Sequence, residues 1–291
     1  MGLRTVPVAA AGLGIASTPL GAAERGRIFQ RHGLDVHRHV SAGAPNVIKE
    51  LMSGEILFGH FAAHAAIEAV TEGADIAVIA GGFNQEFLVG APGVNDLSEL
   101  VGAPVGSGRP RALHHFYVEF TFREVMRAPG RHVHVDGEAD RYRDLLAGKY
   151  KATPLSAPSA VQARMAGCKW LLDYAPYRLS FAFGGVMARR SLLRSDPELV
   201  ESYLRSLVDG IRQYKSDREF GIAVHREINQ VASDVAAETY DVAHSGYSDF
   251  PDPATPGLAR IIDFWKAEGY LPAGFAIGDV VDSGPIRKIR S

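Results

Sequence analysis

The stretch RTVPVAAAGLGIASTPLGAAERGRIFQRHGLDVHRHV, residues 4–40, contains two short apolar runs with a helical pattern between them. Residues 4–10 and 34–40 are typical of β-strands. Between them, Thr18 is a candidate N-cap, and Pro19 suits the first helical position. Proline is tolerated there because the first N–H groups of a helix have no partner within the helix. Because one helix links the two strands, this stretch predicts a βαβ unit with parallel strands.

The same alternation of strands and helices continues beyond this unit. The strands that we expect after residue 40 are residues 55–59, 75–82, 87–92, 103–108, 131–136, 151–158 and 169–174. The pattern restarts near residue 87, which indicates two similar α/β lobes. From Ser195 onward the chain is mainly helical, and Ser195 with Glu198 has the spacing of a capping box.

The composition excludes several classes of partner and site. The chain has 291 residues, is 46% hydrophobic, 22% charged and has a formal net charge of −2. Its Lys and Arg residues are scattered, so nucleic acid is not an expected partner. Cys168 is the only cysteine, which excludes an internal disulfide and a cysteine-based metal site within one chain. No apolar stretch reaches the roughly 18 residues of a membrane span.

Four segments, taken in order, resemble solute-binding proteins of the nitrate/sulfonate/taurine type that serve ABC transporters. The segments are TPLGAAERGRIFQRHGLDVHRHVSAGAPNVIKELMSGEILFG (18–59), DLSELVGAPVGSG (96–108), LLAGKYKATPLSAPSAVQARMAGCKWLLD (145–173) and VMARRSLLRSDPELVESYLRSLVDGIRQY (186–214). The resemblance implies a type-II periplasmic-binding-protein fold, with two lobes of mostly parallel sheet flanked by helices and a ligand cleft between them. Lobe one would comprise residues 1–86 and 187–291, and lobe two residues 87–186.

The resemblance also implies a function, although the same fold carries enzymes. We expect a protein that closes around a small organic solute, anionic or aromatic, as the binding component of an ABC-type uptake system. The alternatives are a cofactor-independent lyase or decarboxylase that uses His60 as general acid/base, and a sensor domain without transport. Related pyrimidine synthases and desulfinases need cysteines that this chain lacks at the matching positions, so we expect no cofactor.

Candidate site residues follow from the position of loops in parallel α/β lobes. Ligands bind beyond the carboxyl ends of the strands, where helix N-termini present free N–H groups. We expect the chain to cross between the lobes a second time near Phe181–Val186, where Phe183 is an aromatic candidate. Together with the residues near the strand ends, the candidates are Ser17, Thr18, Ser41, Gly43, His60, Phe61, Asn84, Ser107, Arg109, His114, Ser156, Ser159 and Phe183. Arg109 follows a Gly-rich turn and could clamp a carboxylate, sulfonate or phosphate group.

His60 and His64 have the i, i+4 spacing of metal ligands, but the segment HFAAH lacks the glutamate of the HExxH motif. A zinc site also needs a third ligand. The histidines in 36–40 and 131–135 alternate along strands, and we expect both strand faces to be exposed. The sequence therefore predicts no metal site.

Location depends on whether Met1 is the native start. An exported or periplasmic protein is expected if the chain is a mature form, and a cytoplasmic one if it is not. As partners we expect a small-molecule ligand and an ABC permease, and as quaternary state a monomer or a weak dimer.

Overall fold

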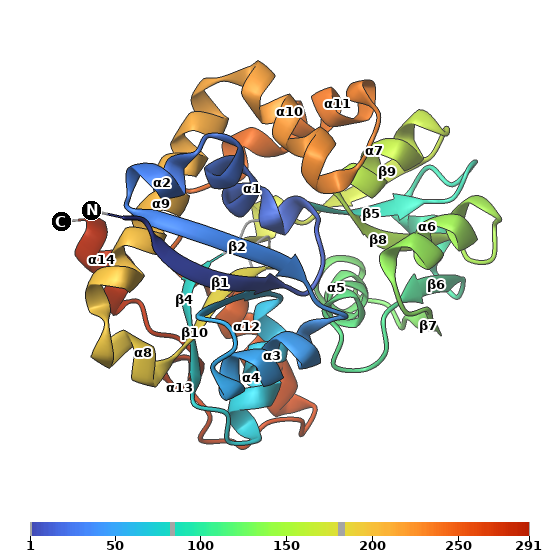
Figure 1. Ribbon diagram of the computed structural model, residues 1–291. Helices are drawn as coiled ribbons and strands as arrows, with labels where there is room; N and C mark the ends of the chain where they lie inside the picture. The colour runs from blue at the N-terminus through green and yellow to red at the C-terminus, as the bar shows by residue number, and fades with distance from the viewer. Residues whose placement is uncertain (1, 82–84, 180–183, 291) are drawn as a thin grey trace. The chain divides into compact units, whose positions relative to one another are not determined.

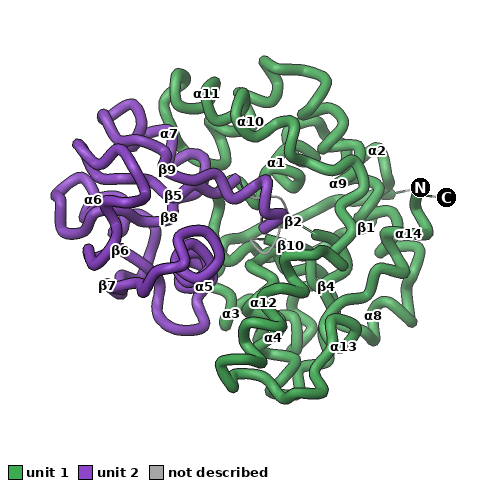
Figure 2. Tube along the Cα trace, turned by 180° about the vertical axis from the view of Figure 1, so that it is seen from behind, with its two compact units in different colours: residues 1–84, 181–291 green, residues 85–180 purple. Residues whose placement is uncertain are grey.

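The computed structural model describes residues 2–81, 85–179 and 184–290, which form two compact units. Unit 1 contains residues 1–84 and 181–291, and unit 2 contains residues 85–180 (Figure 2). The expected boundaries placed Glu86 in the first lobe and Gly185 and Val186 in the second. Instead, Glu86 begins a strand of the second sheet, and Gly185 begins a strand of the first.

Unit 1 has a five-stranded sheet in the order β2-β1-β3-β10-β4 (Figure 1). Its strands are β1 (Arg4–Ala10), β2 (Leu34–Val40), β3 (Phe58–Phe61), β4 (Ile76–Gly81) and β10 (Gly185–Arg189). β1 runs parallel to β2 and β3, whereas β10 runs antiparallel to β3 and β4. The carboxyl ends of β1 to β4 therefore lie at one edge of the sheet, where β10 begins.

Helices cover both faces of this sheet (Figure 1). They are α1 (Thr18–Arg25), α2 (Ile28–Arg31), α3 (Ala44–Ser53), α4 (Ala63–Thr71), α8 (Arg190–Ser195), α9 (Pro197–Ser216), α10 (Arg218–Asn229), α11 (Ser233–Ala243), α12 (Pro256–Ala267), α13 (Ile277–Val280) and α14 (Gly284–Arg290). The apolar face of α9 joins side chains of β1, β3, β4 and β10 in one buried core, together with α1, α2 and α14. Helices α3, α4 and α13 pack on the strands from the other face.

Unit 2 has a second five-stranded sheet, in the order β7-β6-β8-β5-β9. Its strands are β5 (Glu86–Gly90), β6 (Pro104–Ser107), β7 (Arg131–His134), β8 (Ala152–Ser156) and β9 (Lys169–Asp173). β6 runs parallel to β7 and β8, and β5 runs antiparallel to β8. The ends of β6, β7 and β8 thus share an edge with the start of β5.

Three α-helices follow the parallel strands of unit 2 and begin at that same edge. They are α5 (Leu113–Phe120), which continues as a π-helical turn (Thr121–Met126), α6 (Glu138–Leu146) and α7 (Ala157–Met165). Helices α6 and α7 pack against each other and on β8, and α5 packs on β6 and β8. This arrangement brings three helix N-termini to the strand ends.

Several local predictions differ from the structure. The helix expected from Thr18 to Gly33 is divided into α1 and α2, because Arg27 adopts the left-handed conformation with φ 48°. The N-cap of α9 is Asp196 rather than Ser195: the Asp196 carboxylate accepts a hydrogen bond from the backbone N–H of Leu199 at 3.2 Å. Within the described residues, no helix combines the length and the apolar character that crossing a membrane requires.

Candidate functional site

His60 lies inside β3 of unit 1 rather than in the loop after it, where the sequence placed it. The residue is 8% exposed, and its Nε2 lies 2.6 Å from the hydroxyl oxygen of Tyr203 on α9. Burial, and to a smaller extent the positive charge of Arg38, lowers the pKa of His60 to about 3. The ring is therefore neutral near pH 7, and one of its two nitrogens already has a partner within the core.

Replacing Tyr203 by Phe removes the hydroxyl but keeps the ring, which stacks on Phe58 with centroids 3.9 Å apart. The buried Nε2 of His60 then loses its partner, so we expect the free energy of unfolding to fall by about 1–3 kcal/mol. Urea denaturation measures this. The double variant His60→Leu, Tyr203→Phe removes both polar partners and should recover part of the loss. A Tyr203→Phe variant as stable as the wild type would contradict the importance of this bond.

The other candidates of unit 1 lie at the same sheet edge but are largely engaged within the unit. Ser17 is buried, and its hydroxyl contacts the carbonyl oxygen of Gly12 at 3.3 Å. The Ser41 hydroxyl donates to Glu50 Oε1 at 2.6 Å. Thr18 begins α1, and Gly43 precedes α3 with a positive φ of 85° that favours glycine.

The remaining unit 1 candidates give less information. Phe61, the last residue of β3, is buried and pairs with Gly185 of β10. Asn84 and Phe183 lie outside the described residues. His64 lies on α4, where its ring contacts Trp265 edge-on at a centroid distance of 6.3 Å. Because His60 belongs to a strand and His64 to a helix, the pair does not have the helical i, i+4 geometry of metal ligands.

The strand-end edge of unit 2 brings together three of the predicted residues. Ser107 ends β6, Ser156 ends β8, and His114 lies in the first turn of α5. The Ser156 hydroxyl donates to Glu138 Oε1 at 2.5 Å. Ser159 lies near the start of α7 and is half-buried.

Two carboxyl groups, one fully buried and one half-buried, flank His114 at this edge. Its Nε2 lies 3.1 Å from Oε1 of Glu86, whose side chain is fully buried, and 4.0 Å from Oε2 of Glu138. Burial, followed by the charge of Arg141, holds the pKa of His114 well below its ordinary value, although Glu138 acts in the opposite direction. His114 is thus a neutral ring between two carboxyl groups.

Arg141 is the residue that sequence reasoning missed. It lies one turn into α6 and is 2% exposed, and its Nη1 lies 3.5 Å from the carbonyl oxygen of Val135, just after β7. Among the described residues, its Nε and Nη2 have no hydrogen-bond partner. Side chains of a helix lean toward its N-terminus, so the guanidinium extends toward the strand ends. The only signal in the sequence was an arginine one turn after a helix start.

Nε and Nη2 form one side of the planar guanidinium fork. Two parallel N–H donors on that side match the two oxygens of a carboxylate or the oxygens of a sulfonate or phosphate. A buried cation with open donors is unfavourable in the free protein. The geometry therefore resembles a preformed site for an anionic group.

Arg109, the arginine that the sequence nominated, is in a different environment. Its side chain is 75% exposed, and its Nη2 pairs with Oδ2 of Asp136 at 2.7 Å. Exposed pairs of this kind contribute little to stability and are screened by salt. Its role in ligand binding stays a prediction.

Two groups of side chains in the described part of the chain could hold a metal ion. One is Glu86, His114 and Glu138, and the other is His115, Glu119 and His132; in each, one ligand atom per residue lies within 4.8 Å of the others. The expectation that 131–135 forms an exposed strand face is wrong at His132, whose side chain is only 12% exposed. In 36–40 the expectation is confirmed for His37, at 62% exposed, and for His39, at 52%.

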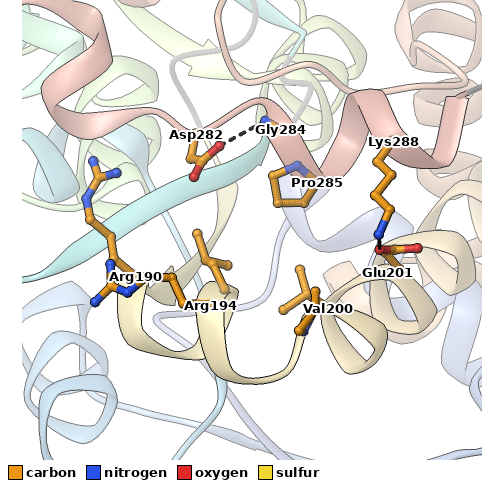
Figure 3. A pocket seen from close by; sticks show the side chains of 10 residues that line it. Arg190, Arg194, Val200, Glu201, Asp282, Gly284, Pro285 and Lys288 are labelled. Carbon is orange, nitrogen blue, oxygen red and sulfur yellow. Dashed lines mark hydrogen bonds and ion pairs between the residues drawn. The ribbon is translucent and has the colours of Figure 1, made fainter.

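A pocket of about 300 Å³ lies elsewhere in unit 1, between α8, α9 and α14 (Figure 3). Arg190 lines this pocket and directly follows β10, which runs antiparallel to β3 and β4. The pocket therefore lies at the edge of the sheet opposite the carboxyl ends of β1 to β4. Several of its polar groups bond within the protein: Lys288 pairs with Glu201, and Asp282 accepts from the backbone N–H of Gly284 at 2.9 Å (Figure 3). It is not at the position where this fold class binds ligands.

Comparison with known proteins identifies the fold. No model of a known protein family matches the sequence, and no curated protein sequence matches it. Solved structures do match over nearly the whole chain. The ligand-binding component of an ABC-type import system from Staphylococcus aureus, solved with zinc bound, is 14% identical, with 98% of this chain and 99% of that chain covered and a TM-score of 0.81.

Two further solved structures are similar. The periplasmic aliphatic sulphonate-binding protein SsuA from Escherichia coli is 15% identical over 98% of this chain and 99% of its own, with a TM-score of 0.80. The periplasmic nitrate-binding protein NrtA from Synechocystis PCC 6803 is 13% identical over 99% and 88%, with a TM-score of 0.75. The chain thus has the fold of periplasmic binding proteins, as its sequence predicted.

Proposed function

We propose that this protein is the solute-binding component of an ABC-type uptake system and that it binds a small organic anion. The similar structures are ABC import and periplasmic binding proteins, two of them named for the anions sulphonate and nitrate. The observation that carries the proposal for this chain is Arg141, a buried guanidinium with an open fork at the strand ends of unit 2. This is the edge at which α/β folds bind ligands.

The surroundings of Arg141 restrict the solute further. Glu86 and Glu138 lie beside His114, and carboxylates repel a second anionic group. The acidic group of the solute therefore belongs on the Nε and Nη2 side of Arg141. A solute that also carries an amino group would direct it toward Glu86 and Glu138.

The candidates of unit 1 stay proposed ligand contacts. Ser17, Thr18, Ser41 and Gly43 lie at the strand-end edge of their own sheet, beside helix N-termini with free backbone N–H groups. The predicted cleft between the lobes stays a prediction.

The enzyme alternative depends on His60 as general acid/base, and its environment argues against that role. A general base works best with a pKa near the working pH. The pKa of His60 is about 3, and its Nε2 is hydrogen-bonded to Tyr203 in the core. We therefore favour binding without turnover. An exported or periplasmic location and an ABC permease partner belong to the same proposal.

A ligand screen on the purified protein tests the function. Thermal shift measured with a panel of small carboxylates, sulfonates, phosphates and nitrate should identify at least one stabilising anion, because a ligand at a hundred times its Kd adds about 2.7 kcal/mol to stability. The panel should include the organic acids both with and without an amino group. If no member of the panel shifts the melting temperature, the anion proposal is wrong.

A further inference from the structure

A second cluster of unit 2 lies outside the solute site and contains three imidazoles. His115 and Glu119 are one turn apart on α5, and His132 lies on β7, the edge strand of the sheet. The ring centroids of His115 and His132 are 4.5 Å apart, and those of His115 and His134 are 5.8 Å apart. This cluster could not be predicted from the sequence, because its members are separated along the chain and come from two elements.

The ring spacings match those of histidines that share one metal ion. A zinc–nitrogen distance of about 2.1 Å, with tetrahedral angles, places the centroids of two ligating rings roughly 5 Å apart and the ligating atoms about 3.4 Å apart. Nε2 of His132 lies 2.6 Å from Oε1 of Glu119, and one ligand atom from each of His115, Glu119 and His132 falls within 4.8 Å of the others. The three prospective ligand atoms are therefore already close to the separations of a shared metal ion.

Neighbouring groups already orient the prospective ligands. Nδ1 of His132 lies 3.1 Å from the hydroxyl of Ser107, which leaves Nε2 directed at Glu119. The other carboxylate oxygen of Glu119, Oε2, is held by Nε of Arg123 at 2.5 Å. Outer partners of this kind fix ring orientation and carboxylate position in protein metal sites.

His134 stands beside the cluster as a prospective fourth ligand. Its Nδ1 donates to the carbonyl oxygen of Gly108 at 2.9 Å, which leaves the Nε2 lone pair available for a metal. Its ring centroid lies 6.1 Å from that of His132. Two or three imidazoles with one carboxylate form a donor set that suits Zn²⁺.

We propose that His115, Glu119 and His132 bind one Zn²⁺ ion on unit 2, with water or His134 in the fourth position. The three ligand residues do not include Arg141, although His132 contacts Ser107 at the same strand-end edge, and the proposal does not depend on the proposed function.

Calorimetric titration with Zn²⁺ tests the site on the whole protein. The wild type should bind one equivalent with micromolar or tighter affinity, and Co²⁺ in place of zinc should give the intense visible absorption of a tetrahedral complex. His115→Ala and His132→Ala should each weaken zinc binding at least about tenfold, since even outer-shell losses cost that much. Glu119→Gln keeps the shape of the side chain and should do the same.

The matched control is His37→Ala, which removes an exposed histidine of unit 1 that also pairs with a carboxylate, Asp35, at 2.8 Å. It should leave zinc affinity unchanged. The proposal is overturned if the wild type binds no zinc in this range or gives only a weak octahedral cobalt spectrum. It is also overturned if the His132→Ala and Glu119→Gln variants bind zinc as the wild type does. This comparison can be made even if the His115→Ala variant does not fold.

Discussion

Replacing Arg141 by Met should abolish most anion binding while leaving the free protein as stable as the wild type, or more stable. In the free protein the substitution removes a buried cation whose Nε and Nη2 have no partner among the described residues, and desolvating such groups is costly. In the complex it removes two charge-assisted hydrogen bonds. Losses of this kind amount to about 3 kcal/mol, or on the order of a hundredfold in Kd.

Titration calorimetry with the best anion of the screen measures the affinity, and thermal denaturation without ligand measures the stability. Arg141→Lys keeps the charge but loses the planar fork, so it should also bind weakly. If Arg141 had only a structural role, the Arg141→Met variant would give the opposite result. Its melting temperature would be lower, and its folded molecules would bind the anion as tightly as the wild type does.

Arg109→Met is the matched control, because it removes the same charge from an exposed position of the same unit. If Arg109 acts at the rim of the site, its loss should reduce affinity only a few-fold, mainly through the association rate, and the difference should disappear at high salt. A larger effect at Arg109 than at Arg141 would transfer the anion contact to Arg109.

Unit 1 should lose stability steeply between pH 7 and pH 5. Burial lowers the pKa of His60 to about 3 and that of His225 to about 4, both below the ordinary value of 6.5. At pH values between the lowered pKa of each folded histidine and the ordinary value of 6.5, the unfolded chain binds a proton that the folded chain does not. The free energy of unfolding therefore falls as the pH falls. Each histidine then removes about 2 kcal/mol between pH 7 and pH 5, or roughly 4 kcal/mol together.

Urea denaturation at the two pH values measures this difference. His60→Leu and His225→Leu should each reduce the pH-dependent loss by about 2 kcal/mol, whatever they do to stability at pH 7. The pH difference is the informative quantity, since substituting a histidine that bonds to Tyr203 or Tyr214 also changes packing. Equal losses in the wild type and in both variants would show that these rings are not buried in neutral form.

The strand–helix alternation predicted the two α/β units well, because periodicity and turn residues are local signals. The predicted ends of the strands and helices were less accurate where contacts between distant segments override the local conformational propensity. β3 begins at Phe58 and includes His60, since its backbone pairs with β1 and β10. β10 itself was not predicted, because the segment reads only as the end of a crossover until β3 and β4 lie on either side of it.

The candidate site was predicted at the level of loops and only partly at the level of side chains. The strand-end rule placed Ser107 and Ser156 at one edge of unit 2, where the structure also has the first turn of α5 with His114; their role in binding stays a prediction. It could not distinguish Arg109 from Arg141, because burial decides which arginine offers unpaired donors, and burial depends on how α6 packs on β8. The position of Glu86 beside His114 likewise depends on the antiparallel pairing of β5 with β8.

The structure of the protein with its best-binding anion bound tests the central claim most directly. The account predicts two oxygens of the acidic group about 2.8 Å from Nε and Nη2 of Arg141, with the rest of the solute beyond the end of β6. An acidic group bound away from Arg141, for example in the pocket beside Arg190 and Lys288, would contradict it.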